Sequence, residues 1–196
     1  MKKQEIRKKM LGIRRLQHKE TRRKRSLMIW KRLKSMDEFA RAGSVLFYLS
    51  LPDEVDTEKM IKESIRMGKK VMVPVTNTGN RTIRPSWLKN YEKELEPGPY
   101  GGILEPKSEC RRIAGKDKVK LVIVPGIAFD RSGARLGFGA GFYDRFLKGF
   151  KHSASVGLAF DFQITPKLPR RPHDVPVGII VTPSRVITCG KKEKTI

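Results

Sequence analysis

The chain has 196 residues, of which 38% are hydrophobic and 32% charged, a composition that indicates a folded domain and excludes a disordered chain. No apolar run is long enough to span a membrane, and no apolar signal-peptide core follows the basic N-terminus. Lysine and arginine number 43 against 20 acidic residues, so the formal net charge is +23. This charge favours anionic partners, or it reflects a charged, solvated surface. We expect one domain over 1–196, located in the cytoplasm, with cysteines and histidines too scattered for a zinc site.

The first segment, residues 2–39, is expected to be helical. Apolar residues recur every three or four positions from Ile6 to Leu16 and again from Leu27 to Met36. The basic stretch "HKETRRKR" separates the two runs and leaves room for a break, although no Gly or Pro marks one. Since 15 of the 43 basic residues fall in this segment, much of the excess charge lies at one end.

An alternation of strands and helices follows. "SVLFYLS" (44–50) and "KKVMVPV" (69–75) have the apolar, β-branched composition of buried strands. Between them "EKMIKESIRMG" (58–68) predicts a helix that begins after Thr57 and ends at Gly68. Residues 76–118 are polar and rich in Pro and Gly, so we expect irregular structure with short strands there, and a functional role for so long a loop.

The second half continues the alternation. "KVKLVIVPGIAFD" (118–130) contains a strand with a turn at Pro125-Gly126, and "GFYDRFLKGF" (141–150) is expected to be a helix. "SASVGLAF" (153–160) and "GIIVTPSRVI" (178–187) predict two more strands, and the residues after Gly190 a charged tail. Strands that alternate with helices imply right-handed βαβ units on a mostly parallel sheet.

The stretch "RLGFGAGFYDRF" (135–146) places glycines at every second position, 137, 139 and 141, between a strand and a helix. Glycines let backbone N–H groups approach an anion, and Arg135 and Arg145 add positive charge. The stretch lacks the dinucleotide-binding fingerprint and the Walker A pattern. From local features alone it is either a phosphate-binding loop or a tight strand–helix turn. Asp144 is correspondingly either a Mg²⁺ ligand beside a phosphate or an acid stabilised by the helix dipole.

The whole stretch "LVIVPGIAFDRSGARLGFGAGFYDRFL" resembles the signature of the 5-formyltetrahydrofolate cyclo-ligase family, P-G-x-x-F-D-x-x-G-x-R-L-G-x-G-x-G-Y-Y-D. Further elements match the family in order along the chain: Lys3 and Arg7 fit a K-x-x-x-R motif, "YLSLPDEVDT" the segment that lines the folate site, "GILEP" (102–106) a G-I-x-E-P element, and "HDVPVG" (173–178) a late H-D element. The resemblance therefore extends from Lys3 to Asp174.

The resemblance implies a three-layer α/β fold of NagB/RpiA/CoA-transferase type, with a mostly parallel sheet and helices on both faces. It implies a ligase that forms a C–N bond, converting 5-formyltetrahydrofolate to 5,10-methenyltetrahydrofolate while ATP becomes ADP and phosphate, with Mg²⁺ as the metal. The residues implied for ATP are Lys3, Arg7, Arg135, Leu136, Gly137, Gly139, Gly141 and Tyr143, with catalytic roles for Lys3, Arg135 and Asp144. The residues implied for the folate are Arg7, Leu51, Asp56, Gly139, Gly141 and Phe142, and those for the metal are Asp144 and Asp174.

The chain departs from the family pattern at a few positions. Phe142 replaces the first tyrosine of Tyr-Tyr-Asp, Phe138 and Ala140 replace residues that are often basic, and Asp56 stands where Glu is common. We expect a monomer that acts on the mono- or polyglutamylated folate and binds neither membranes nor nucleic acid. Two alternatives are a nucleic-acid-binding protein that uses the basic N-terminal helix and a sugar-phosphate or acyl-CoA enzyme on a related fold.

Overall fold

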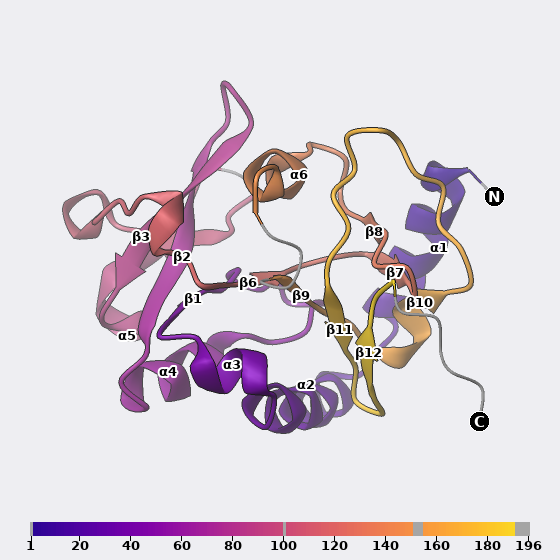
Figure 1. Cartoon of the computed structure of the whole chain (residues 1–196), viewed down its shortest axis with the longest axis horizontal. Coiled ribbons are helices and arrows are strands. Elements are labelled where there is room, and N and C mark those ends of the chain that lie inside the picture. Colours follow the sequence, from indigo (N-terminus) through magenta and orange to yellow (C-terminus); the bar gives the residue numbers. More distant parts are fainter. Residues whose placement is uncertain (1, 100, 151–154, 191–196) are drawn as a thin grey trace.

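A seven-stranded sheet, ordered β12-β11-β9-β6-β1-β2-β3, forms the centre of the protein (Figure 1). The computed structural model describes residues 2–99, 101–150 and 155–190. Each pair of neighbours among the five inner strands is parallel: β1 (Ser44–Leu46), β2 (Lys70–Asn77), β6 (Leu121–Val124), β9 (Ser155–Leu158) and β11 (Ile179–Val181). The edge strands β3 (Thr82–Leu88) and β12 (Val186–Thr188) are antiparallel to their neighbours. The predicted mostly parallel sheet is confirmed.

Both faces of this sheet are buried, because successive side chains of a strand point to opposite sides. Val45 and Val71 face three helices, α2 (Lys19–Lys34), α3 (Asp37–Arg41) and α4 (Glu58–Arg66), which lie below the sheet in Figure 1. Leu46 and Met72 face α6 (Phe142–Leu147) on the other side. The three-layer α/β architecture with helices on both faces is therefore confirmed.

Helix α1 (Lys3–Arg15) packs on a separate small sheet, ordered β10-β7-β8. This sheet comprises β7 (Ala128–Asp130), β8 (Arg135–Leu136) and β10 (Ile164–Thr165). Ile6 and Met10 of α1 are buried against Ala128 and Leu136. The helical prediction for 2–39 is correct in type, but the chain breaks at Leu16–His18 and forms three helices. The break is needed because α1 and α2 cover different sheets, and Leu16 is left 83% exposed.

The polar region 76–118 is more regular than expected. Its first part is β3, which pairs with β2 over seven residues from Thr82 to Leu88. The rest contains short elements as predicted: α5 (Tyr91–Glu94), β4 (Leu95–Pro97), β5 (Leu104–Pro106) and the 3₁₀ turns Ser108–Cys110 and Lys116–Lys118. Pro85 made β3 hard to recognise from the sequence, because proline argues against a central strand. Proline is tolerated here because β3 is an edge strand.

The remaining predictions have mixed outcomes. Thr57 precedes α4, and Gly68 follows it with a φ of 78°, as expected for a helix stop. The stretch 178–187 forms the antiparallel β11 and β12 instead of one strand, and a 3₁₀ turn, Asp161–Gln163, follows β9. Residues 153 and 154 of the predicted strand 153–160, and the predicted tail 191–196, lie outside the described residues. None of the helices in the described ranges is long and apolar enough to cross a membrane.

Candidate active site

A cleft of about 1030 Å³ opens at the carboxyl ends of the central parallel strands. Tyr48 and Leu49, just after β1, and Pro125 and Gly126, just after β6, line it. Strands β1 and β6 are neighbours, and the chain leaves them in opposite directions across the sheet, through β2 on one side and β9 on the other. Ligand sites of open α/β sheets occur at such a reversal of strand order.

The glycine loop 137–141 forms one wall of the cleft. Gly139 and Gly141 have φ of 111° and 74°, a region that side-chain-bearing residues rarely adopt. The N–H groups of residues 137–141 donate no hydrogen bond to the residues that the structure describes. Arg7 Nε donates to the Gly137 carbonyl at 3.0 Å and so connects α1 to the loop. Unpaired N–H groups next to cationic side chains are suited to bind an anion.

Packing explains the Pro-Gly-x-x-Phe-Asp motif at 125–130, which precedes the glycine loop. A Cβ on Gly126 would lie 2.5 Å from the ring of Phe129, so only glycine fits beneath that ring. Asp130 is buried, and its carboxylate accepts N–H bonds from Ser132, Ala134 and Leu168. These contacts fix the turn from β7 to β8 and thereby place the glycine loop.

Arg135 and Asp144 form an ion pair at the base of the loop, with Nη2 and Oδ1 2.9 Å apart. The Arg135 side chain is 5% exposed, and its Nε is buried without a partner among the described residues. The Tyr143 hydroxyl is likewise buried without a partner there, and burial raises the pKa of Tyr143 above its ordinary value. Since buried polar groups are normally satisfied, these two atoms of the cleft wall have capacity for a ligand.

Asp174 lies beside this pair and is bound by Lys3, with Nζ and Oδ2 2.5 Å apart. Burial raises the pKa of Asp174, but hydrogen bonds from Lys3 and the Arg171 N–H outweigh this effect and bring the pKa below its ordinary value. Val175 N–H donates to Asp144 Oδ1 at 3.3 Å, so the two carboxylates lie on neighbouring parts of the cleft wall. Within the described ranges, no three His, Cys, Asp or Glu side chains gather closely enough to hold a metal ion by themselves. Two carboxylates are still sufficient for Mg²⁺ that is bound mainly by phosphate oxygens.

Part of the cleft lining, called here the apolar half, is apolar and contains one buried acid; the cationic half denotes the Lys and Arg side chains, the glycine loop, Asp144 and Asp174. The apolar half includes Leu49, Leu51, Ile83, Ile103 and Phe142. Glu54 lines the same half, is 7% exposed and accepts the Leu51 N–H at 3.1 Å. Burial raises the pKa of Glu54 above its ordinary value although Arg14 acts in the opposite direction. A buried carboxylate at an apolar wall provides a directed acceptor for N–H groups.

The structure places nearly all the predicted site residues in this one cleft. Those in its lining are Lys3, Arg7, Leu51, Arg135, Leu136, Gly137, Gly139, Gly141, Phe142, Tyr143, Asp144 and Asp174. Asp56 is the exception, since it is not among the described residues that line the cleft. Its carboxylate accepts the Glu58 N–H at 2.9 Å and so supports the start of α4.

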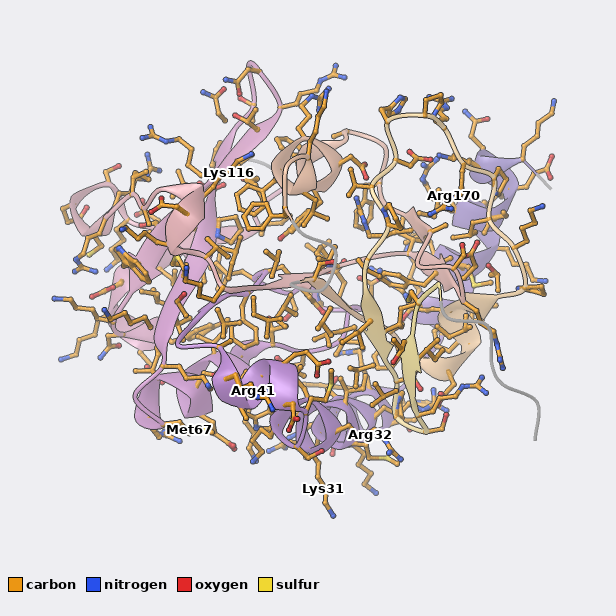
Figure 2. The ribbon with its side chains drawn as sticks, in the orientation of Figure 1. Lys31, Arg32, Arg41, Met67, Lys116 and Arg170 are labelled. Carbon is orange, nitrogen blue, oxygen red and sulfur yellow. The ribbon has the colours of Figure 1, made fainter. Side chains whose placement is uncertain are left out.

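Sequence reasoning missed several residues of the cleft. Glu54 was not singled out within the segment matched to the folate site, although its place after the carboxyl end of β1 was a usable signal. Arg81, Lys148, Arg170 and Arg171, together with the expected Arg145, add to a lining with nine Lys and Arg but only three acidic side chains, Glu54, Asp144 and Asp174. Arg170 belongs to the long loop between β10 and β11 (Figure 2). The cleft therefore carries a strongly positive charge.

Comparison with known proteins identifies the family. The sequence profile of the 5-formyltetrahydrofolate cyclo-ligase family matches residues 1–183. The chain belongs to the 5-formyltetrahydrofolate cyclo-ligase family. It is 37% identical over 151 residues to the 5-formyltetrahydrofolate cyclo-ligase of Escherichia coli strain K12, covering 74% of this chain and 80% of that protein. It is 30% identical over 173 residues to the mouse enzyme of the same name, covering 83% and 84% of the two chains.

Solved structures agree with this membership. The NMR structure of Aquifex aeolicus 5,10-methenyltetrahydrofolate synthetase superposes with a TM-score of 0.84 at 34% identity, covering 100% of this chain and 97% of that one. The synthetase from Mycoplasma pneumoniae, at 17% identity and a TM-score of 0.74, shares the fold. The resemblance first seen in the glycine motif is therefore confirmed, and the chain is an enzyme of this ligase family.

Proposed function

We propose that this enzyme converts 5-formyltetrahydrofolate to 5,10-methenyltetrahydrofolate, with ATP converted to ADP and phosphate. The observation that supports this most is that the lining of one cleft combines two kinds of groups, which we treat as two halves. One half has cations and unpaired backbone N–H groups, suited to a triphosphate. The other is apolar with a buried acid, suited to a flat heterocycle. At about 1030 Å³ the cleft is at the upper end of the usual range for ligand pockets, as expected for two substrates.

The chemistry explains why both substrates must meet. The N5-formyl group is amide-like, and its oxygen is a poor leaving group. When that oxygen attacks the γ-phosphorus, a formyl O–P bond forms, the β–γ bridge breaks and ADP leaves. N10 then attacks the activated carbon, phosphate departs with the formyl oxygen, and N10 loses its proton to complete the five-membered ring. The protein contributes mainly position and charge neutralisation.

The residues of the cationic half supply that neutralisation. Lys3, Arg7 and Arg135 would face the triphosphate, and the N–H groups of the glycine loop would bind its oxygens, with Leu136 and Tyr143 lining the same wall. The donor set fits magnesium, because the neighbouring Asp144 and Asp174 leave its other positions to phosphate oxygens. Bound there, magnesium would spread and offset the charge of the phosphates.

The apolar half would hold the folate. Leu51 and Phe142 would pack against its ring system, with Arg7, Gly139 and Gly141 at the junction of the two halves. The pyrimidinone edge of a folate presents an amino group and a ring N–H side by side, and a carboxylate can accept both. We assign that role to Glu54, because Glu54 lines the cleft whereas Asp56 supports α4.

The test is to mix the purified protein with 5-formyltetrahydrofolate and Mg-ATP and to follow the near-ultraviolet band of the methenyl product. Growth of the band only with ATP, with one phosphate released per product, is the expected result. If folded protein forms no product and instead retains RNA in a salt-sensitive way, the basic surface and nucleic-acid binding become the better explanation.

A further inference from the structure

Arg14 is the most deeply buried charged residue of the described chain. Its side chain is 1% exposed, although it belongs to α1, in which Lys8, Lys9 and Arg15 are exposed. It lies behind the cleft wall and is not among the described residues that line the cleft. A buried guanidinium costs free energy unless its hydrogen bonds are made, so the groups around it indicate why it is there.

Those groups are the two adjacent acids of the turn after β1. Arg14 Nη2 and Nε donate to the two carboxylate oxygens of Asp53 at 2.6 and 3.0 Å, which is a two-point contact. Arg14 Nη1 lies 3.5 Å from Glu54 Oε1. The planar fork of arginine can hold one carboxylate and face a second, which a lysine ammonium cannot do with the same geometry.

The guanidinium also reaches the glycine loop. Its carbon lies 5.8 Å from the centre of the Phe138 ring, and Phe138 lines the cleft. Arg14 thus contacts the acid of the apolar half and the loop of the cationic half, from the same helix that supplies Lys3 and Arg7.

We propose that Arg14 is a positioning residue that fixes the turn through Asp53 and presents Glu54 to the substrate as an oriented carboxylate. Its effect on the substrate rests on the proposed function, but its effect on Glu54 does not. Among the described residues, the charged and titratable groups that interact with Glu54 include Arg14 from α1, Asp53 from the same turn, Tyr48 after β1 and Tyr143 from α6. Arg14 is the cation that contacts Glu54, so its removal should favour the protonated form of Glu54.

The first experiment needs no turnover. Glutamate carboxyl carbons are labelled with ¹³C, the Glu54 signal is assigned by its loss in Glu54→Gln, and its chemical shift is followed with pH. Arg14→Met should raise the pKa of Glu54 above that of the parent, whereas Arg15→Met, which removes an exposed charge on the same helix, should leave it unchanged. An unchanged Glu54 titration in Arg14→Met overturns the proposal.

The second experiment measures kcat and KM for each substrate. Arg14→Met should lower kcat/KM for 5-formyltetrahydrofolate by about tenfold, the loss of roughly one charge-assisted hydrogen bond, with the KM for ATP within twofold of the parent. The acid limb of its pH profile should move to higher pH. Arg14→Lys keeps the charge, so the pH profile should stay in place while the KM for the folate rises.

If Arg14→Met fails to fold, Arg14→Lys and Asp53→Asn can replace it. Arg14→Lys tests the planar geometry of the guanidinium, and Asp53→Asn tests whether the ion pair with Asp53 fixes the turn. Equal losses toward both substrates, or a pH profile that does not move in Arg14→Met, would mean that Arg14 only stabilises the fold. A parent protein without turnover contradicts the proposed function, while the NMR titration still decides whether Arg14 controls Glu54.

Discussion

Replacement of Glu54 by glutamine tests whether Glu54, and not the Asp56 expected from the family resemblance, is the acid that binds the folate. Glu54 is 7% exposed, lines the cleft, accepts the Leu51 N–H through Oε2 and has Arg14 Nη1 3.5 Å from Oε1. Glutamine keeps one acceptor oxygen but turns an NH₂ group toward the second donor of the pyrimidinone edge. The loss of one charge-assisted hydrogen bond is worth about 1.5–3 kcal/mol. We therefore expect kcat/KM for 5-formyltetrahydrofolate to fall by roughly 10- to 150-fold.

The assay is the initial rate of methenyl product formation at saturating Mg-ATP, with the folate concentration varied. Asp56→Asn is the matched control, because it removes a charge two residues away. Asp56→Asn keeps an oxygen that can accept the Glu58 N–H and loses only the negative charge of that acceptor. The free energy of unfolding should therefore change by less than about 1 kcal/mol, and kcat/KM by less than about twofold. A Glu54→Gln enzyme as active as the parent, or an equal loss in Asp56→Asn, would refute the assignment of Glu54.

The same variant changes the pH dependence of stability. The folded pKa of Glu54 lies above its ordinary value because of burial, so the folded state binds the proton more tightly than the unfolded state does. The contribution of Glu54 to the free energy of unfolding is therefore present below the ordinary pKa and is lost as pH rises through the folded pKa. Denaturant unfolding should show that Glu54→Gln loses less stability than the parent between acidic and neutral pH.

Three further substitutions test the cationic half. Asp144→Asn should lower turnover on the order of a hundredfold while the protein stays folded, and unchanged turnover would end the role of Asp144. Lys3→Ala should raise the KM for ATP about tenfold with little effect on the KM for the folate; an unaltered ATP dependence would remove Lys3 from the site. Gly139→Ala should strain the loop by about 1–3 kcal/mol, because its φ is 111°, and weaken ATP binding, although the new Cβ would meet only Arg7 at 3.6 Å. Gly12→Ala, in an open position of α1, is its control and should raise stability by up to about 1 kcal/mol without changing activity.

Much of the fold could be predicted because local pattern and tertiary packing agree. Val71, Met72 and Val73 are all buried, so the apolar run of β2 has the composition of a strand covered on both faces. The glycine motif was also readable, since its turn conformations and its contact with Phe129 depend on nearby residues. Leu16 could not be placed, because it continues the helical rhythm of α1 yet lies in the break before α2.

The choice between Asp56 and Glu54 shows what sequence alone lacks. Both acids lie in one short turn, and their spacing does not decide which faces the cleft. The orientation depends on Arg14, which is 39 and 40 residues from Asp53 and Glu54 in the chain, and on the Leu51 N–H, which accounts for one oxygen of Glu54. Only the tertiary structure brings these groups together.

The most direct test of the account follows the formyl oxygen. The enzyme would turn over 5-formyltetrahydrofolate labelled with ¹⁸O in the formyl group, with unlabelled Mg-ATP and water, and the released phosphate would be analysed by mass. If the cleft brings the formyl oxygen to the γ-phosphate, each phosphate carries one ¹⁸O. Product formed with unlabelled phosphate, and the label lost to water, would contradict the proposed activation of the formyl group by ATP.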